Sequence, residues 1–475
     1  MRAGEKIFPA RLREKDMLES DTIAAIATGM GTAGIGIIRI SGAEAFAVAE
    51  RIFVPLQREK KLTEQDSYTA HYGNIVDGTE IVDEVIVLLM KGPHSYTAED
   101  TVEIDSHGGI CVMKRILELV LRKGARAAQP GEFTKRAFLN GRIDLSQAEA
   151  VMDVIQAKNE YALKSSVRQL KGSLLNLIRK IREQILYEIA FIESALDDPE
   201  HISLDGYPQQ LQGRMKCLIK ETGELLLHAD QGRILREGIQ TVLTGKPNAG
   251  KSSVLNVLAG DERAIVTEVA GTTRDTLEEQ IQIRGLLLNI IDTAGIRQTD
   301  DVVEKIGVNK ARKSVADADL VLYVVDSSTP LDENDLEIAS LLAGQKVIVL
   351  LNKTDLPVVT SQEMMEAVFP GPIVCISAKE ETGFDQFSDI LEEMFLKGSI
   401  SYDDEMYLTN VRQRTAMAAA KESLEKVRES IELGMPEDFF SIDLMDAYQT
   451  LGSITGESAG EDLVNEIFSR FCVGK

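Results

Sequence analysis

Long hydrophobic runs are missing from this chain of 475 residues. No apolar stretch reaches the roughly 18 residues that a membrane-spanning helix requires. Residues 1–20 mix charged side chains with few hydrophobic ones, so they lack the apolar core of a secretory signal and are expected to form an N-terminal extension. These two absences predict a cytoplasmic protein.

Cysteine and histidine are scarce as well. The cysteines are Cys111, Cys217, Cys375 and Cys472, and no two of them form a C-x-x-C pair. This spacing argues against a disulfide framework and a zinc site, and it fits a reducing compartment. The five histidines are dispersed along the chain, which disfavours a transition-metal centre.

Basic residues are outnumbered by acidic ones. The chain has 52 Lys and Arg against 76 Asp and Glu, which gives a formal net charge of −24. Proteins that hold nucleic acid by neutralising its phosphates usually have a basic balance. The charge therefore argues against a simple RNA-binding module, although RNA stays open as a substrate through a local basic patch or a partner chain.

The chain is too long for a single hydrophobic core, so we expect several domains. Short β-rich runs at 35–40 and 85–89, with a helical pattern near 112–122, predict a small α+β domain over residues 21–135. We find no internal repeat and no low-complexity tract in the sequence.

Helical periodicity follows this domain. Ser146 and Glu149 have the spacing of a capping box at the start of a helical segment, 146–196. A second block spans 215–235, after a break at Asp198-Pro199, so we expect the first part of a helical domain at 136–237. Apolar residues at three- and four-residue steps predict one long helix with the core seam of a bundle; they are Val167, Leu170, Leu174, Leu177, Ile181, Ile185, Ile189, Ile192 and Leu196.

Strands alternate with helices in the next segment, 238–396. Helical patterns then return at 409–433 and 463–471. The simplest interpretation is an α/β domain inserted into a helical domain whose second part is 397–475. The parallel sheet of this α/β domain is predicted by five apolar runs of buried-strand length, each followed by a turn or helix; they lie at 239–244, 286–291, 320–325, 347–351 and 373–376.

A phosphate-binding loop opens the α/β segment. Gly245-x-x-x-x-Gly250-Lys251-Ser252 stands between an apolar run and a helical pattern, which is the strand–loop–helix context that such a loop requires. Its glycines let backbone amides converge on phosphate oxygens, and the helix N-terminus adds a positive dipole end. We expect Lys251 to reach the β- and γ-phosphates and the Ser252 hydroxyl to join a Mg²⁺ shell.

Companion motifs follow in the order expected of a GTP site. Asp292-Thr293-Ala294-Gly295 closes a strand run, where Asp292 can support the magnesium and Gly295 can meet the γ-phosphate. Gly271-Thr272-Thr273 lies in the segment where a mobile loop brings Thr273 onto magnesium. Ile296 stands where small signalling GTPases carry a glutamine that orients the attacking water, so either hydrolysis is slow or other groups substitute.

The base-recognition motif decides between guanine and adenine. Asn352-Lys353-Thr354-Asp355 ends another strand run, and Ser377-Ala378-Lys379 closes a further one. The Asp355 carboxylate can accept hydrogen bonds from the N1–H and the exocyclic amine of guanine. Adenine lacks this donor pair and would leave the carboxylate unpaired, which is costly. The sequence therefore predicts GTP as the nucleotide.

At this point the chain resembles the tRNA modification GTPases usually called MnmE or TrmE. The resemblance runs from Asp21 to Lys475. It depends on Gly36-Ile-Ile-Arg39-Ile-Ser-Gly42, on Pro130-Gly-Glu-Phe-Thr-Lys-Arg-Ala-Phe-Leu-Asn-Gly141, on the GTPase motifs and on the ending Phe471-Cys472-Val473-Gly474-Lys475. It implies an N-terminal folate-binding domain that makes a homodimer, a helical domain, and an inserted Ras-like GTPase domain.

The resemblance also implies the nucleotide and metal ligands. Potassium would lie beside the phosphates on Asn248, Thr267, Val269 and Thr272, and Glu304 would act on the attacking water through a further water. Magnesium would be held by Ser252 and Thr273. The implied GTP-binding residues are Asn248, Ala249, Gly250, Lys251, Ser252, Ser253, Thr267, Glu268, Val269, Ala270, Gly271, Thr272, Thr273, Asp292, Thr293, Ala294, Gly295, Asn352, Lys353, Asp355, Ser377, Ala378 and Lys379.

The reaction that the resemblance implies is the addition of a carboxymethylaminomethyl or aminomethyl group to C5 of the wobble uridine of certain tRNAs. A partner, MnmG, would supply FAD and NADH chemistry in a heterotetramer, and a tetrahydrofolate derivative would supply the carbon. Folate contacts carry over to Arg39, Glu103, Arg142 and Lys475. Position 142 is Arg where the family has Lys, which keeps the charge and changes the donor geometry.

Other interpretations stay open or are disfavoured. A GTP-dependent regulatory or ribosome-assembly switch without its own modification chemistry is the alternative function. A nucleophilic role for Cys472 is disfavoured because no histidine lies near it in the sequence to activate the thiol. Gly29-x-Gly31-x-x-Gly34 matches a dinucleotide fingerprint, but a β-like run follows it instead of a helix.

Overall fold

The computed structural model describes residues 21–56, 61–260, 278–292, 315, 318–369, 371–395, 408 and 410–475. It divides into two compact units. One comprises Met1–Met152, Gln169–Ile219 and Ala416–Lys475, and the other comprises Asp153–Arg168 and Lys220–Thr415. The five segments expected from the sequence, with their bounds, stay predictions. Within the described ranges, no helix is long and apolar enough to cross a membrane.

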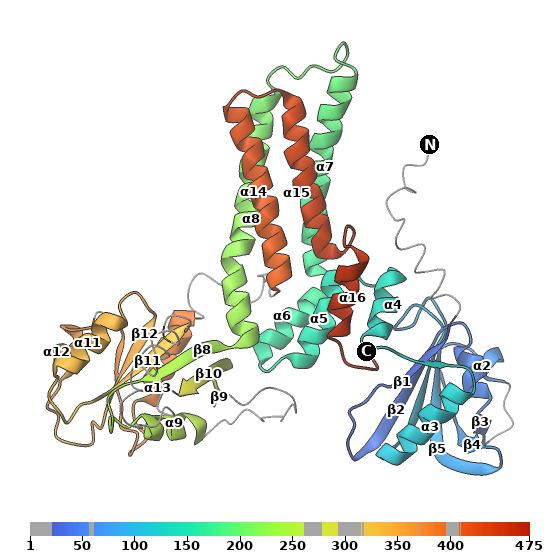
Figure 1. Cartoon of the computed structure of the whole chain (residues 1–475), viewed down its shortest axis with the longest axis horizontal. Helices are drawn as coiled ribbons and strands as arrows, with labels where there is room; N and C mark the ends of the chain where they lie inside the picture. Colours follow the sequence, from blue (N-terminus) through green and yellow to red (C-terminus); the bar gives the residue numbers. More distant parts are fainter. Residues whose placement is uncertain are drawn as a thin grey trace, which may run out of the picture. The chain divides into compact units, whose positions relative to one another are not determined.

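A seven-stranded sheet forms the N-terminal part of the first unit (Figure 1). Its strand order is β3-β4-β5-β6-β2-β1-β7, and every pairing is antiparallel except that of β1 with β7. The strands are β1 (Ile23–Ile26), β2 (Ala33–Ser41), β3 (Phe53–Pro55), β4 (Thr69–Asp77), β5 (Glu80–Met90), β6 (Thr101–Gly108) and β7 (Arg126–Ala127).

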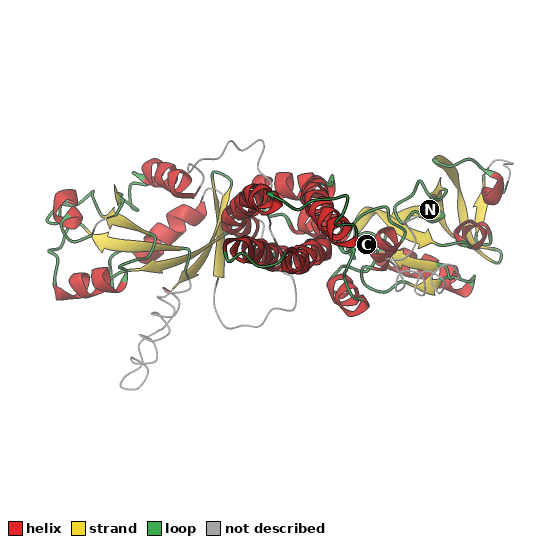
Figure 2. Cartoon of the chain, turned by 90° about the horizontal axis from the view of Figure 1, so that it is seen from above, coloured by secondary structure: helices red, strands yellow, loops and turns green. Residues whose placement is uncertain are grey.

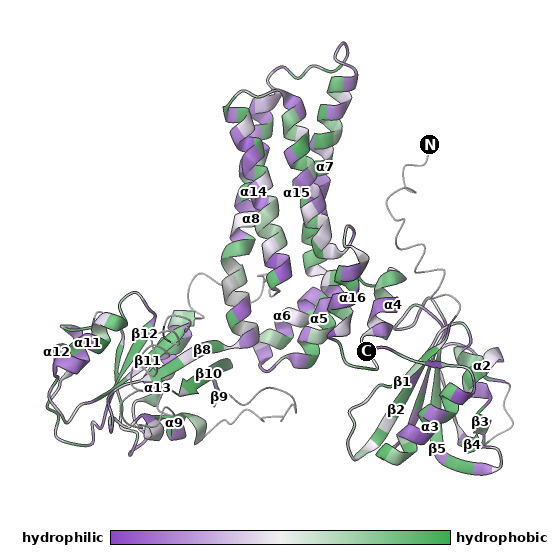
Figure 3. Ribbon diagram, in the orientation of Figure 1, coloured by the Kyte–Doolittle hydropathy of each residue, from purple (hydrophilic) through white to green (hydrophobic). Residues whose placement is uncertain are grey.

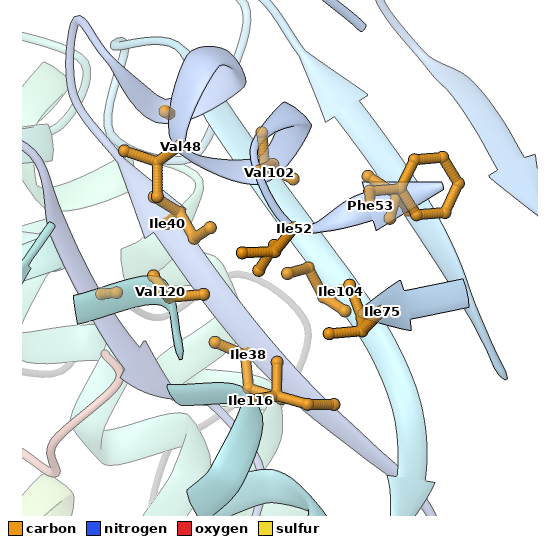
Figure 4. Close-up of a cluster of buried hydrophobic side chains, with 14 of the residues drawn as sticks. Ile38, Ile40, Val48, Ile52, Phe53, Ile75, Val102, Ile104, Ile116 and Val120 are labelled. Carbon is orange, nitrogen blue, oxygen red and sulfur yellow. The ribbon is translucent and has the colours of Figure 1, made fainter. Parts of the chain in front are cut away.

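One face of this sheet is covered by α2 (Ala45–Glu50) and α3 (Ile110–Arg122), while a short 3₁₀ turn, η1 (Leu62–Glu64), lies beside α2. Alternate residues of β2 and β6, such as Ile38, Ile40 and Ile104, point to the helices and pack against Ile116 and Val120 of α3 (Figure 4). The opposite face carries the intervening residues of the same strands.

Helices make up the rest of the first unit. They are α4 (Glu132–Leu139), α5 (Leu145–Gln156), α7 (Ser173–Asp197), the first part of α8 (Tyr207–Glu237), most of α14 (Val411–Glu432), α15 (Glu437–Thr455) and α16 (Glu461–Ser469). Figure 2 shows the long helices end on. Helix α7 packs along α15, so helices from before and after the α/β segment belong to one bundle.

The long helix expected from the apolar stripe at Val167–Leu196 is wrong, because the structure divides this stripe between two helices. Val167 and Leu170 lie on α6 (Glu160–Leu170) and the later members lie on α7, because Gly172 adopts the left-handed conformation at φ 85° and α7 begins after it. Apolar spacing continues across the turn, so periodicity alone did not reveal the break. Leu196, the last member of the expected stripe, is 47% exposed.

The expected capping box at Ser146 and Glu149 is also wrong. The first turn of α5 is capped by Asp144, whose carboxylate accepts from the backbone N of Gln147 at 2.9 Å, while the Gln147 side chain accepts from the backbone N of Asp144 at 3.0 Å. Ser146 donates to the same Asp144 oxygen at 2.7 Å. The reciprocal pair therefore lies two residues earlier than predicted.

Helix α15 is missing from the sequence prediction. Its buried residues Phe440, Leu444, Ala447, Leu451 and Ile454 follow three- and four-residue steps, so the signal was present in the sequence. This helix lines the bundle core beside α7.

The second unit contains a six-stranded sheet of order β13-β12-β11-β8-β10-β9. All pairings are parallel except that of β9 with β10. In the described part of this segment, α9 (Lys251–Gly260), α11 (Glu333–Leu341) and α12 (Gln362–Glu366) lie between strands, and α13 (Phe384–Phe395) follows the last strand. The strands are β8 (Ile239–Thr244), β9 (Glu278–Ile283), β10 (Leu286–Asp292), β11 (Leu320–Asp326), β12 (Val347–Asn352) and β13 (Ile373–Cys375).

The parallel strands coincide with the five predicted runs, and they are mostly hydrophobic along their length (Figure 3). Strand β12 is buried at every residue, as a strand covered on both faces must be. The edge strand β9 was not predicted. The expected fold class is confirmed: an α+β domain, a helical domain, and an α/β domain with a mainly parallel sheet.

Candidate functional site

The carboxyl ends of the parallel strands form the first candidate site. Strands β8, β10, β11 and β12 run in the same direction, and Asp292 pairs with Leu243 while Asp326 pairs with Asn352. Ligands of open α/β sheets bind at this edge, where the strands give way to loops. The phosphate loop, the base-recognition motif and the end of β10 therefore meet at one edge of the second unit.

The phosphate loop is held in a conformation that glycine permits. Gly245 has φ 147°, and a Cβ there would lie 2.2 Å from the carbonyl oxygen of Val324. Gly250 has φ 97°, and a Cβ there would lie 2.2 Å from the Asn352 side-chain nitrogen. Both positions exclude any other residue. Asn248 adopts φ 64°, a left-handed conformation that asparagine tolerates better than most residues.

Lys251 begins α9 and its side chain folds back over the loop. Its Nζ donates to the carbonyl oxygens of Gly245 and Lys246, both at 2.8 Å. Ser252 and Ser253 follow in the first turn and are exposed. The ammonium group and the free helix N-terminus therefore face the same loop, as an anion site requires.

The base-recognition residues lie on the neighbouring loops. The Asp355 carboxylate accepts from the Ser377 hydroxyl at 2.7 Å, and the Nζ of Lys379 lies 3.8 Å from the other oxygen. The hydrogen bond from Ser377 holds the pKa of the Asp355 carboxyl below its usual value. Asp355 is therefore an ionised acceptor near neutral pH, which suits two N–H donors of guanine.

Asn352 and Lys353 support this loop. Asn352 is 2% exposed, donates from its side chain to the carbonyl of Ala249 at 2.9 Å, and accepts from the backbone N of Ala378 at 3.1 Å. Lys353 has φ 65° and its Nζ lies 2.6 Å from Asp326 at the end of β11. These contacts therefore connect the end of β12 with the end of β11, with the phosphate loop and with the loop after β13.

Several predicted residues lie outside the described part of the chain. For Asp292 the structure describes the backbone, at the end of β10. Within the described ranges, no group of three or more His, Cys, Asp or Glu residues could hold a metal ion. The predicted residues that lie outside the description are Thr267, Glu268, Val269, Ala270, Gly271, Thr272, Thr273, Thr293, Ala294, Gly295 and Glu304, together with Ile296.

A second candidate site lies in the first unit, on the sheet face that α2 and α3 leave uncovered. Arg39 and Glu103 are register partners on β2 and β6, and the Nε of Arg39 donates to Glu103 at 2.7 Å. The guanidinium carbons of Arg39 and Arg142 lie 4.9 Å and 4.8 Å from the centroid of the Tyr96 ring. Two of the predicted folate residues therefore lie against one aromatic ring, and a third, Glu103, is hydrogen-bonded to one of them.

The end of the chain joins the same cluster. Arg39 donates from Nη1 to the carbonyl of Gly474 at 3.2 Å, which brings the neighbouring Lys475 to this site. Gly474 has φ 94°, and a Cβ there would lie 2.3 Å from the carbonyl oxygen of Ile26 in β1. Glycine is needed here because the tail passes directly over the strand.

Sequence reasoning missed Tyr96 and Phe133. The ring of Phe133 lies 5.7 Å from the Arg39 guanidinium carbon, and the Tyr96 hydroxyl lies 3.0 Å from the Thr134 hydroxyl. Both aromatic residues stack with cations, which aromatic faces favour. Phe133 belongs to the Pro130–Gly141 motif used for the family resemblance, so this motif could have indicated it as a site residue. Tyr96 lies in a loop without a recognisable pattern.

Two family models together match most of the chain, and the second match includes the phosphate-loop motifs. The model for the GTP-binding protein TrmE N-terminus matches residues 22–142, and the model for the MnmE helical domain matches residues 145–472. The second of these matches spans more than half of the sequence.

Curated relatives match over nearly the whole length. The chain is 57% identical to the tRNA modification GTPase MnmE of Lachnoclostridium phytofermentans, over 96% of this chain and 100% of that protein. It is 47% identical to the MnmE of Clostridioides difficile, over 97% and 100%.

Among solved structures, the G domain of the Thermotoga maritima FeoB iron transporter is 26% identical, covers 35% of this chain and 99% of its own, and has a TM-score of 0.26. Because this TM-score is low, the fold is assigned from the strand order of the sheet and not from this likeness. From the family matches and the curated relatives, the chain belongs to the MnmE family of tRNA modification GTPases and is a GTP-hydrolysing enzyme.

Proposed function

We propose that this chain is a potassium-dependent GTPase that, with an FAD-containing partner, modifies C5 of the wobble uridine of certain tRNAs. The added group is carboxymethylaminomethyl or aminomethyl, and its carbon comes from a tetrahydrofolate derivative. The observation that carries the proposal is that one chain combines a guanine-type nucleotide site at Asp355 with an arginine-rich site at Arg39 and Arg142. The first site supplies the hydrolysis cycle and the second supplies the carbon donor.

Magnesium and potassium would be held at the phosphate loop. Ser252 presents an exposed hydroxyl in the first turn of α9, and hydroxyl oxygen is a ligand that Mg²⁺ accepts in phosphate-loop proteins. Asn248 presents a side-chain amide oxygen from a left-handed position of the same loop, which fits a potassium ligand. A potassium ion there would add positive charge beside the transferred phosphoryl group. Thr267, Val269, Thr272 and Thr273 would complete the two ligand sets.

Glu304 is proposed to act on the attacking water through a second water. Small signalling GTPases orient the attacking water with a glutamine, but this chain has Ile296 at that place. The Glu304 carboxylate would take over the role of that glutamine. Replacement by alanine should leave GTP binding intact, because binding depends on the phosphate loop and Asp355, while it abolishes potassium-stimulated turnover.

The second site fits a tetrahydrofolate. Glu103 can accept from the amino group of a pterin, and the guanidinium groups of Arg39 and Arg142 can pair with the carboxylates of the glutamate tail. Lys475 would add a further cation beside Gly474. In the described structure Glu103 pairs with Arg39, so binding would exchange part of that ion pair for contacts with the ligand.

A homodimer is proposed through the N-terminal domain. The sheet face that carries Arg39 also exposes Val54, Tyr72, Ile86 and Ile35, with exposed fractions between 44% and 64%. Exposed apolar patches of this kind usually mark interaction surfaces. A second copy of the chain is the proposed occupant, and the FAD-containing partner MnmG would join it in a heterotetramer in the cytoplasm.

Analysis of tRNA nucleosides from cells that lack this protein tests the proposal. The wobble-uridine modification should be absent and should return when the wild-type chain is supplied. Normal modification in the deletion strain would contradict the proposal and would favour the alternative, a GTP-dependent regulatory or ribosome-assembly switch.

A further inference from the structure

Lys246 lies in the phosphate loop, and its side chain pairs with two carboxylates at the start of α11. Its ammonium nitrogen lies 2.7 Å from the Asp332 carboxylate and forms an ion pair with Asp335 as well. The side chains of Lys246 and Asp335 are 27% and 4% exposed, so the pair is largely shielded from water. The nucleotide-binding residues predicted from the sequence did not include Lys246.

The side chain of Asp335 is held by hydrogen bonds that do not involve Lys246. It lies in the first turn of α11, where Asp332 and Asp335 form a capping box: the Asp332 side chain accepts from the Asp335 backbone N, and the Asp335 side chain accepts from the Asp332 backbone N at 3.0 Å. The other Asp335 oxygen accepts from the Tyr323 hydroxyl at 2.8 Å, and Tyr323 is 1% exposed on β11. Because each oxygen already has a fixed donor, the carboxylate offers a rigid anchor.

The backbone of Lys246 faces the phosphate-binding lysine. The carbonyl oxygens of Gly245 and Lys246 each accept from the Nζ of Lys251 at 2.8 Å. Gly245 is locked over β11 by its close approach to Val324. The Lys246 carbonyl also accepts from the backbone N of Ala249 at 3.4 Å, within the loop, and the Lys246 side chain links this part of the loop to α11.

We propose that the ion pair of Lys246 with Asp332 and Asp335 positions Lys251, by fixing the Lys246 carbonyl that orients the Lys251 ammonium group. Lys246 is then a positioning residue for nucleotide binding and hydrolysis. Its ammonium group pairs with the carboxylates at the start of α11 and does not itself bind the phosphates. Burial lowers the pKa of Lys246, but hydrogen bonds to the two carboxylates outweigh this and raise it overall, so the residue stays protonated. The inference depends on the proposed GTP site.

The test compares Lys246→Ala with Lys246→Arg. Loss of the ion pair should weaken GDP and GTP affinity roughly ten-fold, and should also lower kcat, because a displaced Lys251 loses contacts in both the ground state and the transition state. Lys246→Arg keeps the positive charge and is long enough to reach α11, so its nucleotide affinity and its kcat should both stay close to those of the wild type. The preference for GTP over ITP should not change, since Asp355 is untouched.

Two further variants separate positioning from folding. Asp332→Ala removes the more exposed carboxylate and the side-chain cap of α11, while the Asp335 carboxylate keeps its bonds from the Asp332 backbone N and the Tyr323 hydroxyl, so affinity should fall about two- to three-fold. Arg284→Ala, which removes an exposed ion pair with Asp389 and Glu392 in the same unit, should leave affinity and kcat at the wild-type level. Thermal unfolding without nucleotide shows whether each variant is folded.

The outcomes are distinct. Reduced affinity and kcat in folded Lys246→Ala, with recovery in Lys246→Arg, support the inference. Wild-type affinity and kcat in Lys246→Ala overturn it, and so does a loss that arginine fails to restore. If Lys246→Ala does not fold, wild-type affinity in Asp332→Ala overturns it. Failure of the wild-type chain to bind GTP would contradict the proposed function itself.

Discussion

The side-chain amide of Asn352 donates a hydrogen bond of 2.9 Å to the carbonyl oxygen of Ala249, and its oxygen accepts one of 3.1 Å from the backbone of Ala378. One buried side chain therefore joins the phosphate loop, the Asn352–Asp355 turn and the loop that follows β13. We therefore predict that binding of the phosphates and recognition of the base are coupled through this residue.

Replacement of Asn352 by alanine should cost about 2–3 kcal/mol in the stability of the α/β domain, because two buried backbone groups lose their partners. GTP affinity should fall as well, since the phosphate loop is no longer held against β12. Urea unfolding and GDP titration measure the two effects. The exposed Asn334 in the same domain offers a matched control, and Asn334→Ala should change neither quantity. Equal behaviour of the two variants would contradict the coupling.

Replacement of Asp355 by asparagine should exchange the preferred base. The carboxylate accepts two N–H donors of guanine, whereas an amide offers one acceptor and one donor, the pattern that pairs with xanthine. GTP affinity should drop by roughly a hundred-fold or more, and XTP affinity should rise. Competition titrations with the two nucleotides measure the change. Unaltered preference for GTP would remove Asp355 from base recognition.

Replacement of Tyr96 by alanine should weaken the binding of 5-formyltetrahydrofolate by about five- to ten-fold, because the ring no longer supports the guanidinium groups of Arg39 and Arg142. Tyr96→Phe keeps the ring and loses the hydroxyl contact with Thr134, so it should bind nearly as well as the wild type. Calorimetric titration compares the two variants. An equal loss in both would show that the hydroxyl matters instead of the ring.

The N-terminal domain should lose stability in acid through a buried ion cluster. Arg136 is 1% exposed, and it pairs with Asp21 at 2.6 Å and with Glu132 at 3.1 Å. Burial raises the pKa of Asp21 and of Glu132, but hydrogen bonds from Arg126, aided by the charge of Arg136, outweigh it and leave both pKa values below the usual range. Groups with a depressed folded pKa stabilise above their unfolded pKa.

The stabilisation by this cluster should therefore be complete above about pH 4.5 and lost as the pH falls through the folded pKa values. Between pH 5 and 3 the thermal unfolding midpoint of the wild type should fall. The midpoint of Glu132→Gln should fall less steeply with pH, because this variant has one titrating group fewer. Glu118→Gln, on the exposed side of α3, should follow the wild type. Identical slopes for wild type and Glu132→Gln would contradict the assignment.

The parallel strands could be read from the sequence because they are apolar at successive positions, as burial on both faces requires. Strand β9 could not, because its sequence is Glu-Glu-Gln-Ile-Gln-Ile and its pairing is supplied by β10 alone. The break before α7 escaped notice because Gly172 turns the chain while the apolar spacing continues.

The residues proposed for the nucleotide site come from short contiguous motifs. The phosphate loop and the Asn352–Asp355 turn each place their reactive groups within a few residues, so spacing alone indicates their role. Tyr96 could not be found in this way, because Arg39 on β2 and Arg142 in the turn after α4 reach its ring only in the folded chain. Lys246 was overlooked because its partners lie on α11, far along the chain.

The most direct test of the account combines the purified chain with the FAD-containing partner, a tetrahydrofolate donor and unmodified tRNA in potassium buffer. Mass spectrometry of the wobble uridine reports the product. The account predicts modified uridine with GTP, and none with ATP or with a GTP analogue that cannot be hydrolysed. Equal modification in the absence of GTP hydrolysis would contradict it.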